Sequence, residues 1–156
     1  MRIGIVSDTH DKVLAALHYA LAGVDEILHA GDIASTEALA EIETIAPVTA
    51  VRGNMDERAL ADRLPEEEIL TRRGVRIALV HGHRVGRASV NDLANRFHGR
   101  GVDLVVWGHI HEPISELRNG IRYFNPGTGG GIGAGATCGL LMIADDSFAI
   151  EHIALA

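Results

Sequence analysis

Apolar residues in this chain come in short runs separated by polar clusters. The first run, residues 3–6, has no polar side chain on either face, which is typical of a strand buried on both sides. Leucines at helical spacing follow it, and a glycine ends their pattern. We therefore expect a strand over Arg2–Val6 and a helix over Asp11–Gly23, with Asp11 as the N-cap.

The same order continues up to residue 56. Strand-like runs over Glu26–Ala30 and Pro47–Val51 enclose a helical pattern that Ser35 can cap and that Pro47 ends. Strands that alternate with helices in this way form a parallel sheet. The carboxyl ends of these strands should therefore meet at one edge, which is where open α/β sheets bind their ligands.

Hairpins become frequent after residue 56. A short helix is expected over Glu57–Leu64 and another from the N-cap Ser89 to about His98, while Val102–Trp107 is predicted as a buried strand. Turn residues such as Asn119-Gly120 predict antiparallel pairs, namely Glu67–Thr71 with Val75–Val80, Ile114–Leu117 with Ile121–Phe124, and Leu140–Ile143 with Phe148–Ile153. No repeat or linker divides the sequence, so we expect one domain over residues 1–156.

Polar clusters stand at the ends of five strand-like runs. They are Asp8-Thr9-His10, Gly31-Asp32, Gly53-Asn54, His81-Gly82-His83 and Gly108-His109-Ile110-His111. Each has an ordinary explanation when taken alone, because Asp32 could cap a helix and Asn54 could be a turn residue. Similarly, His109 or His111 could be a buried histidine at a strand end. The recurrence at successive strand ends favours a shared metal site instead.

The mixture of groups in these clusters indicates the kind of metal. Imidazole and carboxylate ligands with an amide oxygen suit Mn²⁺, Fe or Zn²⁺ better than Mg²⁺ or Ca²⁺. Two cations about 3.5–4 Å apart need a bridging ligand, and Asp32 is the candidate because it lies between the others in chain order. The expected ligands are Asp8, His10 and His111 for one ion, and Asn54, His81 and His109 for the other.

Glycines accompany the clusters. Those beside the ligands are expected to let the backbone turn sharply, and they are Gly31, Gly53, Gly82 and Gly108. A further six glycines fall in residues 127–135. This stretch could be a flexible loop, or its backbone amides could approach phosphate oxygens near the metals. It lacks the Lys-Ser/Thr of a phosphate loop.

Composition limits the kinds of molecule that the protein is expected to bind. The net charge of −7 provides no basic field for long nucleic acid, and bound cations would offset its repulsion of phosphate. No apolar run approaches the ~20 residues of a membrane helix, and no leader pattern precedes the first strand. The single cysteine, Cys138, lies in an apolar run and is expected to be a buried thiol. We expect a cytoplasmic protein with no membrane partner.

In order and spacing, the polar clusters resemble the motifs of the calcineurin-like metallophosphoesterases. The segments Ser7–His10, His29–Asp32 and Asn125–Gly127 are similar to the small single-domain bacterial and archaeal phosphodiesterase branch. The resemblance implies an α/β fold, namely a four-layer α/β/β/α sandwich of two mixed β-sheets flanked by helices. It also implies two divalent metal ions held as above, with Mn first and Ni, Fe or Zn as alternatives, and a homodimer or homotetramer.

The chain departs from the wider family in Gly53-Asn54-Met55-Asp56. Many members have a histidine at the position of Met55, and it gives a proton to the leaving group. A thioether cannot do so. We hypothesise that the proton comes from water or His83, and that diesters with good leaving groups are favoured. A second departure is the glycine run after Gly127, where the family commonly has a serine and soon a basic residue.

The function that follows is in-line hydrolysis of small phosphodiesters. A water or hydroxide that bridges the ions attacks phosphorus, and Asn54 and His83 orient the phosphate. Two alternatives stay open. A retromer subunit of the same fold acts as an interaction platform, so the chain could be a scaffold, although its complete set of ligands argues against this. A nuclease is the other alternative, but the DNA-repair members are longer and carry nucleic-acid-binding additions.

Overall fold

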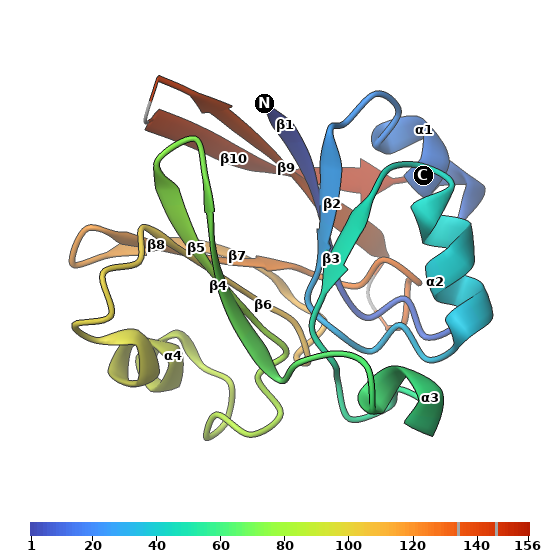
Figure 1. The fold of residues 1–156 in the computed structure, drawn as a ribbon, viewed down its shortest axis with the longest axis horizontal. Coiled ribbons are helices and arrows are strands. Elements are labelled where there is room, and N and C mark those ends of the chain that lie inside the picture. The colour runs from blue at the N-terminus through green and yellow to red at the C-terminus, as the bar shows by residue number, and fades with distance from the viewer. Residues whose placement is uncertain (134, 146) are drawn as a thin grey trace.

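Two five-stranded sheets pack face to face in the computed structural model of this chain, which describes residues 1–133, 135–145 and 147–156 (Figure 1). The first sheet contains β1 (Arg2–Val6), β2 (Glu26–His29), β3 (Val48–Ala50), β9 (Ala136–Ala144) and β10 (Ser147–Leu155). The second contains β4 (Glu67–Arg72), β5 (Val75–Val80), β6 (Leu104–Trp107), β7 (Pro113–Arg118) and β8 (Ile121–Pro126). The helices are α1 (Ala15–Ala20), α2 (Thr36–Glu43), α3 (Arg58–Ala61) and α4 (Val90–Phe97).

The first sheet has the strand order β10-β9-β1-β2-β3, and it contains the parallel strands that the sequence predicts. β1 pairs with β2, Ile3 beside Glu26, and β2 pairs with β3, all in parallel. On its other side β1 pairs with β9 antiparallel, Ile3 beside Leu141, and β10 follows at the edge. The first strand of the chain therefore lies in the middle of a sheet that is completed by the last two.

The second sheet has the order β4-β5-β6-β8-β7, with antiparallel pairs at both edges and parallel pairs between them. The edge pairs are hairpins whose turns, Arg73-Gly74 and Asn119-Gly120, have positive φ at both residues, as tight two-residue turns require. Both predicted hairpins are confirmed. The predicted pairing of β9 with β10 is present too, but Asp146 in its turn lies outside the described residues.

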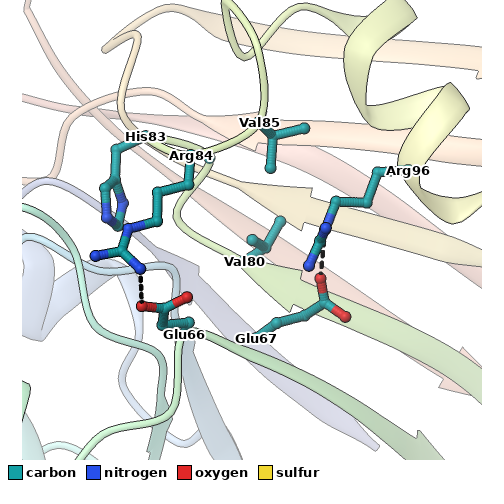
Figure 2. A pocket seen from close by; sticks show the side chains of 8 residues that line it. Glu66, Glu67, Val80, His83, Arg84, Val85 and Arg96 are labelled. Carbon is teal, nitrogen blue, oxygen red and sulfur yellow. Dashed lines mark hydrogen bonds and ion pairs between the residues drawn. The ribbon is translucent and has the colours of Figure 1, made fainter.

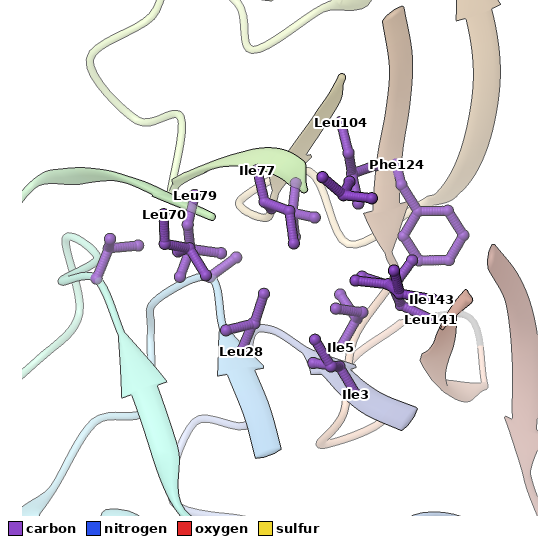
Figure 3. Packing of buried hydrophobic residues seen from close by; sticks show 14 residues of the cluster. Ile3, Ile5, Leu28, Leu70, Ile77, Leu79, Leu104, Phe124, Leu141 and Ile143 are labelled. Carbon is purple, nitrogen blue, oxygen red and sulfur yellow. The ribbon is translucent and has the colours of Figure 1, made fainter. Parts of the chain in front are cut away.

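The core between the sheets consists of side chains from both (Figure 3). Ile3 and Ile5 of β1 face Ile77 and Leu79 of β5 and Phe124 of β8, and all are fully buried. The central strands β1, β2, β5 and β6 are buried on both faces. This explains why their sequences are mostly apolar runs without alternation.

Helices cover the outer faces of the sheets (Figure 1). α1 and α2 pack on the first sheet through Leu17 and Ile42, and α4 packs on the second through Leu93 and Phe97. Gly4 gives room to Leu21, the residue directly after α1, because a Cβ on Gly4 would lie 2.8 Å from Leu21 Cδ1. The layers are helix, sheet, sheet and helix, so the predicted α/β/β/α sandwich is confirmed. No helix among the described residues is long and apolar enough to cross a membrane.

Two of the three expected helix caps are confirmed. The hydroxyls of Ser35 and Ser89 accept backbone N–H groups of α2 and α4, so Asp32 is not the cap of α2. The expectation that Asp11 caps α1 is wrong, because α1 begins four residues later, at Ala15. Asp11 has a φ of 63° and donates its N–H to Ile33 O at 3.0 Å. The segment after β1 runs beside the segment after β2 before it turns into the helix.

A buried ion pair joins the two sheets at the end where β2 begins. The carboxylate of Glu26 accepts Nε and Nη2 of Arg72, at the end of β4, at 2.6 and 2.7 Å, and Thr49 Oγ1 at 2.7 Å. Glu26 is 8% exposed. Burial opposes its ionisation, but the hydrogen bonds from Arg72 and Thr49 outweigh burial and hold the pKa of Glu26 below its ordinary value of 4.5.

Replacing Glu26 by Gln should lower the free energy of unfolding at pH 7 by about 1.5–3 kcal/mol, the range for hydrogen bonds to charged groups. Because the folded pKa of Glu26 lies below the unfolded one, this stabilisation is complete above about pH 4.5 and is lost as the pH falls through the folded pKa. Urea titrations should therefore show a smaller difference at about pH 3 than at pH 7. Asp62→Asn, which removes the exposed pair with Arg58, is the control and should change little at either pH. An equal loss for Glu26→Gln at both pH values would contradict the assignment.

Candidate metal centre

The predicted site residues come together at one end of the sandwich, where parallel strands of both sheets have their carboxyl ends. The first sheet supplies Asp8 and His10 after β1, Asp32 after β2 and Asn54 after β3. The second supplies His81 and His83 after β5, and His109 and His111 after β6. The loops of two sheets thus face one another across a small volume.

Asp8, His10 and His111 form a first group, whose ligand atoms lie within 4.8 Å of one another. Asp8 Oδ1 is 3.1 Å from His111 Nε2 and 3.7 Å from His10 Nε2. The two Nε2 atoms are 3.3 Å apart. A carboxylate oxygen and two imidazole nitrogens therefore face one point.

Asp8, Asp32 and His81 form a second group within the same distance limit. Asp32 Oδ2 lies 3.3 Å from His81 Nε2 and 3.6 Å from His10 Nε2, so this oxygen stands between the two groups. Asn54 Oδ1 is 3.2 Å from His81 Nε2. This is the placement that a bridging Asp32 requires.

Hydrogen bonds to other parts of the protein hold several of the ligand side chains in place. Asp8 Oδ2 accepts the Ser7 hydroxyl at 2.5 Å and the His109 N–H at 3.0 Å. Asp8 Oδ1, in contrast, is buried and has no hydrogen-bond partner among the described residues. The Nδ1–H of His81 donates to Ala30 O at 2.7 Å, which leaves its Nε2 as a ligand atom. A buried carboxylate oxygen without a partner is costly unless a cation is near. The residues present therefore fit divalent metal ions.

Two of the predicted residues border these groups rather than belong to them. The ring centroid of His109 is 5.2 Å from that of His81, and its imidazole is in neither tight group. The ring of His83 is 5.4 Å from that of His81, and its buried Nδ1 has no hydrogen-bond partner in the described part of the chain. Burial, together with the charges of His81 and Arg84, lowers the pKa of His83.

Carboxylates and imidazoles in the centre shift each other's protonation. Burial opposes ionisation of Asp8 and Asp32, but hydrogen bonds and charge from His10 and His81 outweigh it, so the pKa of each carboxyl is lowered. The hydrogen bond to Asp8 raises the pKa of His10. Burial alone would lower the pKa of His81. The hydrogen bond to Asp32 outweighs burial, so the pKa of His81 is raised. The centre attracts positive charge, for which protons and metal ions compete.

The backbone that carries the ligands is strained. φ is 54° at Asp8, 46° at His10 and 55° at Asp32. It is 72° at His109 and 60° at His111. Residues other than glycine rarely adopt this left-handed conformation, and those that do cluster at functional sites. The strain is a mark of the site that single-sequence patterns do not reveal.

The glycines of the clusters serve the site in two ways, and only one of them was predicted from the sequence. Gly31 and Gly82 have φ values of 95° and 103° and provide the expected sharp turns. The same explanation is wrong for Gly53 and Gly108, whose φ values are not positive. A Cβ on Gly53 would overlap Asp32 Oδ1, and a Cβ on Gly108 would overlap the loop after β1. These two glycines allow neighbouring loops to approach closely.

His29 connects two of the loops that carry ligands, and no role was predicted for it from the sequence. Its Nδ1 accepts the Gly31 N–H at 3.2 Å, so its Nε2–H faces Thr9 Oγ1, also at 3.2 Å. It thereby joins the loop after β1 to the loop after β2. Burial lowers the pKa of His29 to about 4, so the imidazole is neutral at physiological pH.

Asp56 and Asn125 join other pairs of loops. Asp56 accepts the Ala34 N–H at 2.8 Å and the Gly53 N–H at 2.6 Å. Asn125 donates to Gly108 O at 2.9 Å. His29 and Asn125 are polar residues near the ends of buried strands, which is the signal that identified the ligands. The same signal could therefore have found them.

The segment that follows β8 packs against the exit of β1. Gly129 donates its N–H to Ser7 O at 2.8 Å, and Gly130 to Asp8 O at 3.3 Å. The Thr128 hydroxyl donates to Asp8 O at 2.9 Å. These residues are buried. Neither predicted interpretation holds for this part of the glycine run, because its amides are used inside the protein and its packing is close.

An α/β/β/α sandwich that gathers carboxylates, imidazoles and an amide at one end has the features of a metal-dependent hydrolase. Comparison with family models agrees. The model of the calcineurin-like phosphoesterase superfamily domain matches residues 1–146. The chain therefore belongs to this superfamily, as the motifs predicted.

Curated relatives carry corresponding names. A probable metallophosphoesterase of Methanothermobacter thermautotrophicus is 35% identical over 133 residues, which cover 82% of this chain and 77% of that protein. Phosphodiesterase MJ0936 of Methanocaldococcus jannaschii is 32% identical over 146 residues, which cover 81% of this chain and 83% of that protein. These relatives support a hydrolase that acts on phosphate esters.

Solved structures share the fold over nearly the whole chain. A structure of an archaeal phosphodiesterase superposes with a TM-score of 0.79 at 28% identity, covering 99% of this chain and 100% of that one. Vps29 of Entamoeba histolytica, solved in complex with Zn²⁺, superposes with a TM-score of 0.81 at 23% identity and covers both chains fully. The second similarity is evidence for the fold alone.

Replacing His29 by Phe should weaken Mn²⁺ binding by about 10–100-fold, the usual loss when a group that orients metal ligands is removed. Phenylalanine fills the space but cannot accept the Gly31 N–H or donate to Thr9. Isothermal titration calorimetry measures the affinity, and circular dichroism checks the fold. His29→Gln keeps a donor and an acceptor and should lose less. His18→Phe, on the surface of α1, should bind Mn²⁺ as the parent does. A folded His29→Phe variant with unchanged affinity would show that His29 has no such role.

Proposed function

We propose that this protein is a phosphodiesterase that hydrolyses small phosphodiesters with two divalent metal ions. The observation that carries the proposal is the buried Asp8 Oδ1, which has no hydrogen-bond partner in the described part of the chain and faces the imidazoles of His10 and His111. Burial of a carboxylate oxygen without a partner is costly unless a cation lies near it. Membership of the calcineurin-like phosphoesterases and the identity of 32% to a named phosphodiesterase support the choice of substrate class.

The proposed ligands are Asp8, His10 and His111 for one ion and Asn54, His81 and His109 for the other, with Asp32 shared between them. Mn²⁺ is the metal that we expect, with Ni²⁺, Fe or Zn²⁺ as alternatives, because mixed imidazole and carboxylate sites suit these ions. Ions held here would lower the pKa of a water molecule towards neutrality and offset the charge of the phosphate oxygens.

Side chains at the rim of the metal centre are proposed to orient the phosphate and to protonate the leaving group. Asn54 is exposed, and with His83 it orients the phosphate. Met55 is 59% exposed at the same rim, and its thioether has no proton to give. The leaving-group oxygen therefore takes its proton from water or from His83. The bond from phosphorus to that oxygen breaks as water attacks from the opposite side.

The substrate that we propose is small. With a net charge of −7 the chain has no general attraction for long nucleic acid, which also argues against the nuclease alternative. A single domain over residues 1–156, a cytoplasmic location and assembly as a homodimer or homotetramer stay predictions.

A protein-interaction scaffold is the second candidate function. The similarity of fold to Vps29 favours it, with TM-scores of 0.84 and 0.81 for two structures of the Entamoeba histolytica protein. Against it stands the complete set of ligand-type side chains at the end of the sandwich. Metal-dependent turnover of a phosphodiester distinguishes the enzyme from the scaffold.

Metal-stripped protein should hydrolyse bis(p-nitrophenyl) phosphate faster than the mono-ester once Mn²⁺, Ni²⁺ or Zn²⁺ is added back. Release of p-nitrophenolate measures both rates, with Mg²⁺ as the metal for comparison. Asp32→Ala should lose activity and metal together, because one of its oxygens lies between both groups of ligands. Full activity of Asp32→Ala would overturn the scheme. Absence of turnover with every metal, while ions bind, would favour the scaffold.

Replacing Met55 by His should raise the rate on diesters with poor leaving groups, because an imidazole at this position can give a proton to the departing alkoxide. Diesters with good leaving groups should respond little. Rates of a series of leaving groups of increasing pKa measure the effect, and Met55→Gln is the control that adds polarity without an acid. An unchanged rate on poor leaving groups would reject the idea that a proton donor is missing here.

A further inference from the structure

A cavity of about 220 Å³ lies beside the metal centre, between the start of β4, the loop after β5 and α4 (Figure 2). His83 lines the cavity, and its ring centroid lies 5.4 Å from that of His81 and 6.4 Å from that of His109. One imidazole therefore separates the cavity from the proposed metal ligands.

Part of the lining of the cavity is apolar. Val80 and Val85 are 6% and 7% exposed, and together with Gly82 they present no polar side chain. In Figure 2 both valines lie between Arg84 on one side and Arg96 on the other. A flat apolar face fits against this part of the wall.

The rim carries two carboxylates that guanidinium groups hold. Arg84 Nη1 donates to Glu66 Oε1 at 2.5 Å, and Figure 2 shows this pair beside His83. Arg96 Nε donates to Glu67 Oε2 at 2.8 Å on the opposite side. Arg52 also donates to Glu66, and Arg100 to Glu67, so ion pairs neutralise both carboxylates. In the hydrogen bonds of the described residues Arg96 uses only its Nε–H, so its terminal nitrogens remain as donors.

We propose that this cavity binds a neutral heteroaromatic arm of the substrate, of the kind that a nucleobase provides. The proposal rests on the phosphodiesterase function proposed above. The ring packs on the valines, its edge meets donors on Arg96 and acceptors on the glutamates, and a guanidinium plane can stack on its face. Pockets that hold a whole drug-sized ligand measure about 300–1,000 Å³, so a cavity of 220 Å³ takes one arm of a diester.

The test compares esters that share the p-nitrophenolate leaving group. These are the p-nitrophenyl esters of adenosine and thymidine 5′-phosphate, and methyl p-nitrophenyl phosphate. The ratio of kcat/KM for a nucleoside ester to that for the methyl ester isolates the contribution of the arm. We expect the Mn²⁺-loaded protein to prefer at least one nucleoside ester by about tenfold or more.

Arg96→Ala and Val85→Phe should each lower this ratio by about tenfold, the first by removing donors and the second by filling the cavity. Arg100→Ala is the matched control, because Arg100 also binds Glu67, at 2.5 Å, but does not line the cavity. Its ratio should equal that of the parent. A ratio near one in the parent, or an unchanged ratio in Arg96→Ala, would overturn the proposal, and Arg96 is exposed enough to be replaced without loss of the fold.

A binding measurement separates failure of this proposal from failure of the proposed function. If no ester is hydrolysed, the phosphodiesterase assignment fails, and calorimetry with adenosine and thymidine 5′-phosphates against methyl phosphate still tests the cavity. Tighter binding of a nucleotide, weakened about tenfold in Arg96→Ala but not in Arg100→Ala, supports the cavity. Equal affinity of the three ligands for the parent protein rejects it.

Discussion

The metal centre depends on one buried carboxylate, that of Asp8. Its oxygens have different tasks. Oδ2 holds the Ser7 hydroxyl and the His109 N–H, and so ties the loop after β1 to the loop after β6, while Oδ1 has no partner among the described residues. Because these loops belong to different sheets, the carboxylate takes its position only in the assembled sandwich. A residue with positive φ and an unsatisfied oxygen persists only where the surrounding structure over-determines it.

Three of the buried groups that hold the ligand loops are uncharged. The imidazole of His29, the hydroxyl of Thr128 and the amide of Asn125 each tie down a ligand loop, and all three are fully or almost fully buried. A charged support in the same place would attract or repel the cations that the ligands hold, and would add its own cost of burial. These neutral supports help to fix the geometry without adding charge to the centre, whereas Asp56 is a charged support that accepts the Ala34 and Gly53 N–H groups. The ion pair of Glu26 with Arg72 between the sheets joins β2 to the far end of β4.

Apolar runs and the strand–helix alternation were sufficient to predict the strands and the parallel order of the first three, because such patterns constrain topology strongly. The sandwich was predicted from the resemblance of the polar clusters to a known family, and the meeting of the ligands from the recurrence of those clusters at strand ends. Local patterns failed where distant segments compete. Asp11 has the chemistry of a cap, yet its N–H pairs with Ile33 across the sheet edge. The need for Gly108 comes from a loop about one hundred residues earlier, and the cavity beside His83 comes from side chains of β4 and α4. Such contacts join residues that are far apart in the sequence, so no pattern within a short window of residues predicts them.

The position of β1 between β2 and β9 has a consequence for the way the chain is made. Ile3 pairs with Leu141, and the amino group of Met1 donates to Ile143 O across a separation of 142 residues. Contacts of such long range make folding slow. During synthesis one edge of β1 stays open until β9 has left the ribosome, and an open edge can pair with other chains. The carbonyls of Ser7 and Asp8 likewise await residues 128–130. The first ligand to be translated is thus among the last to be fixed in place.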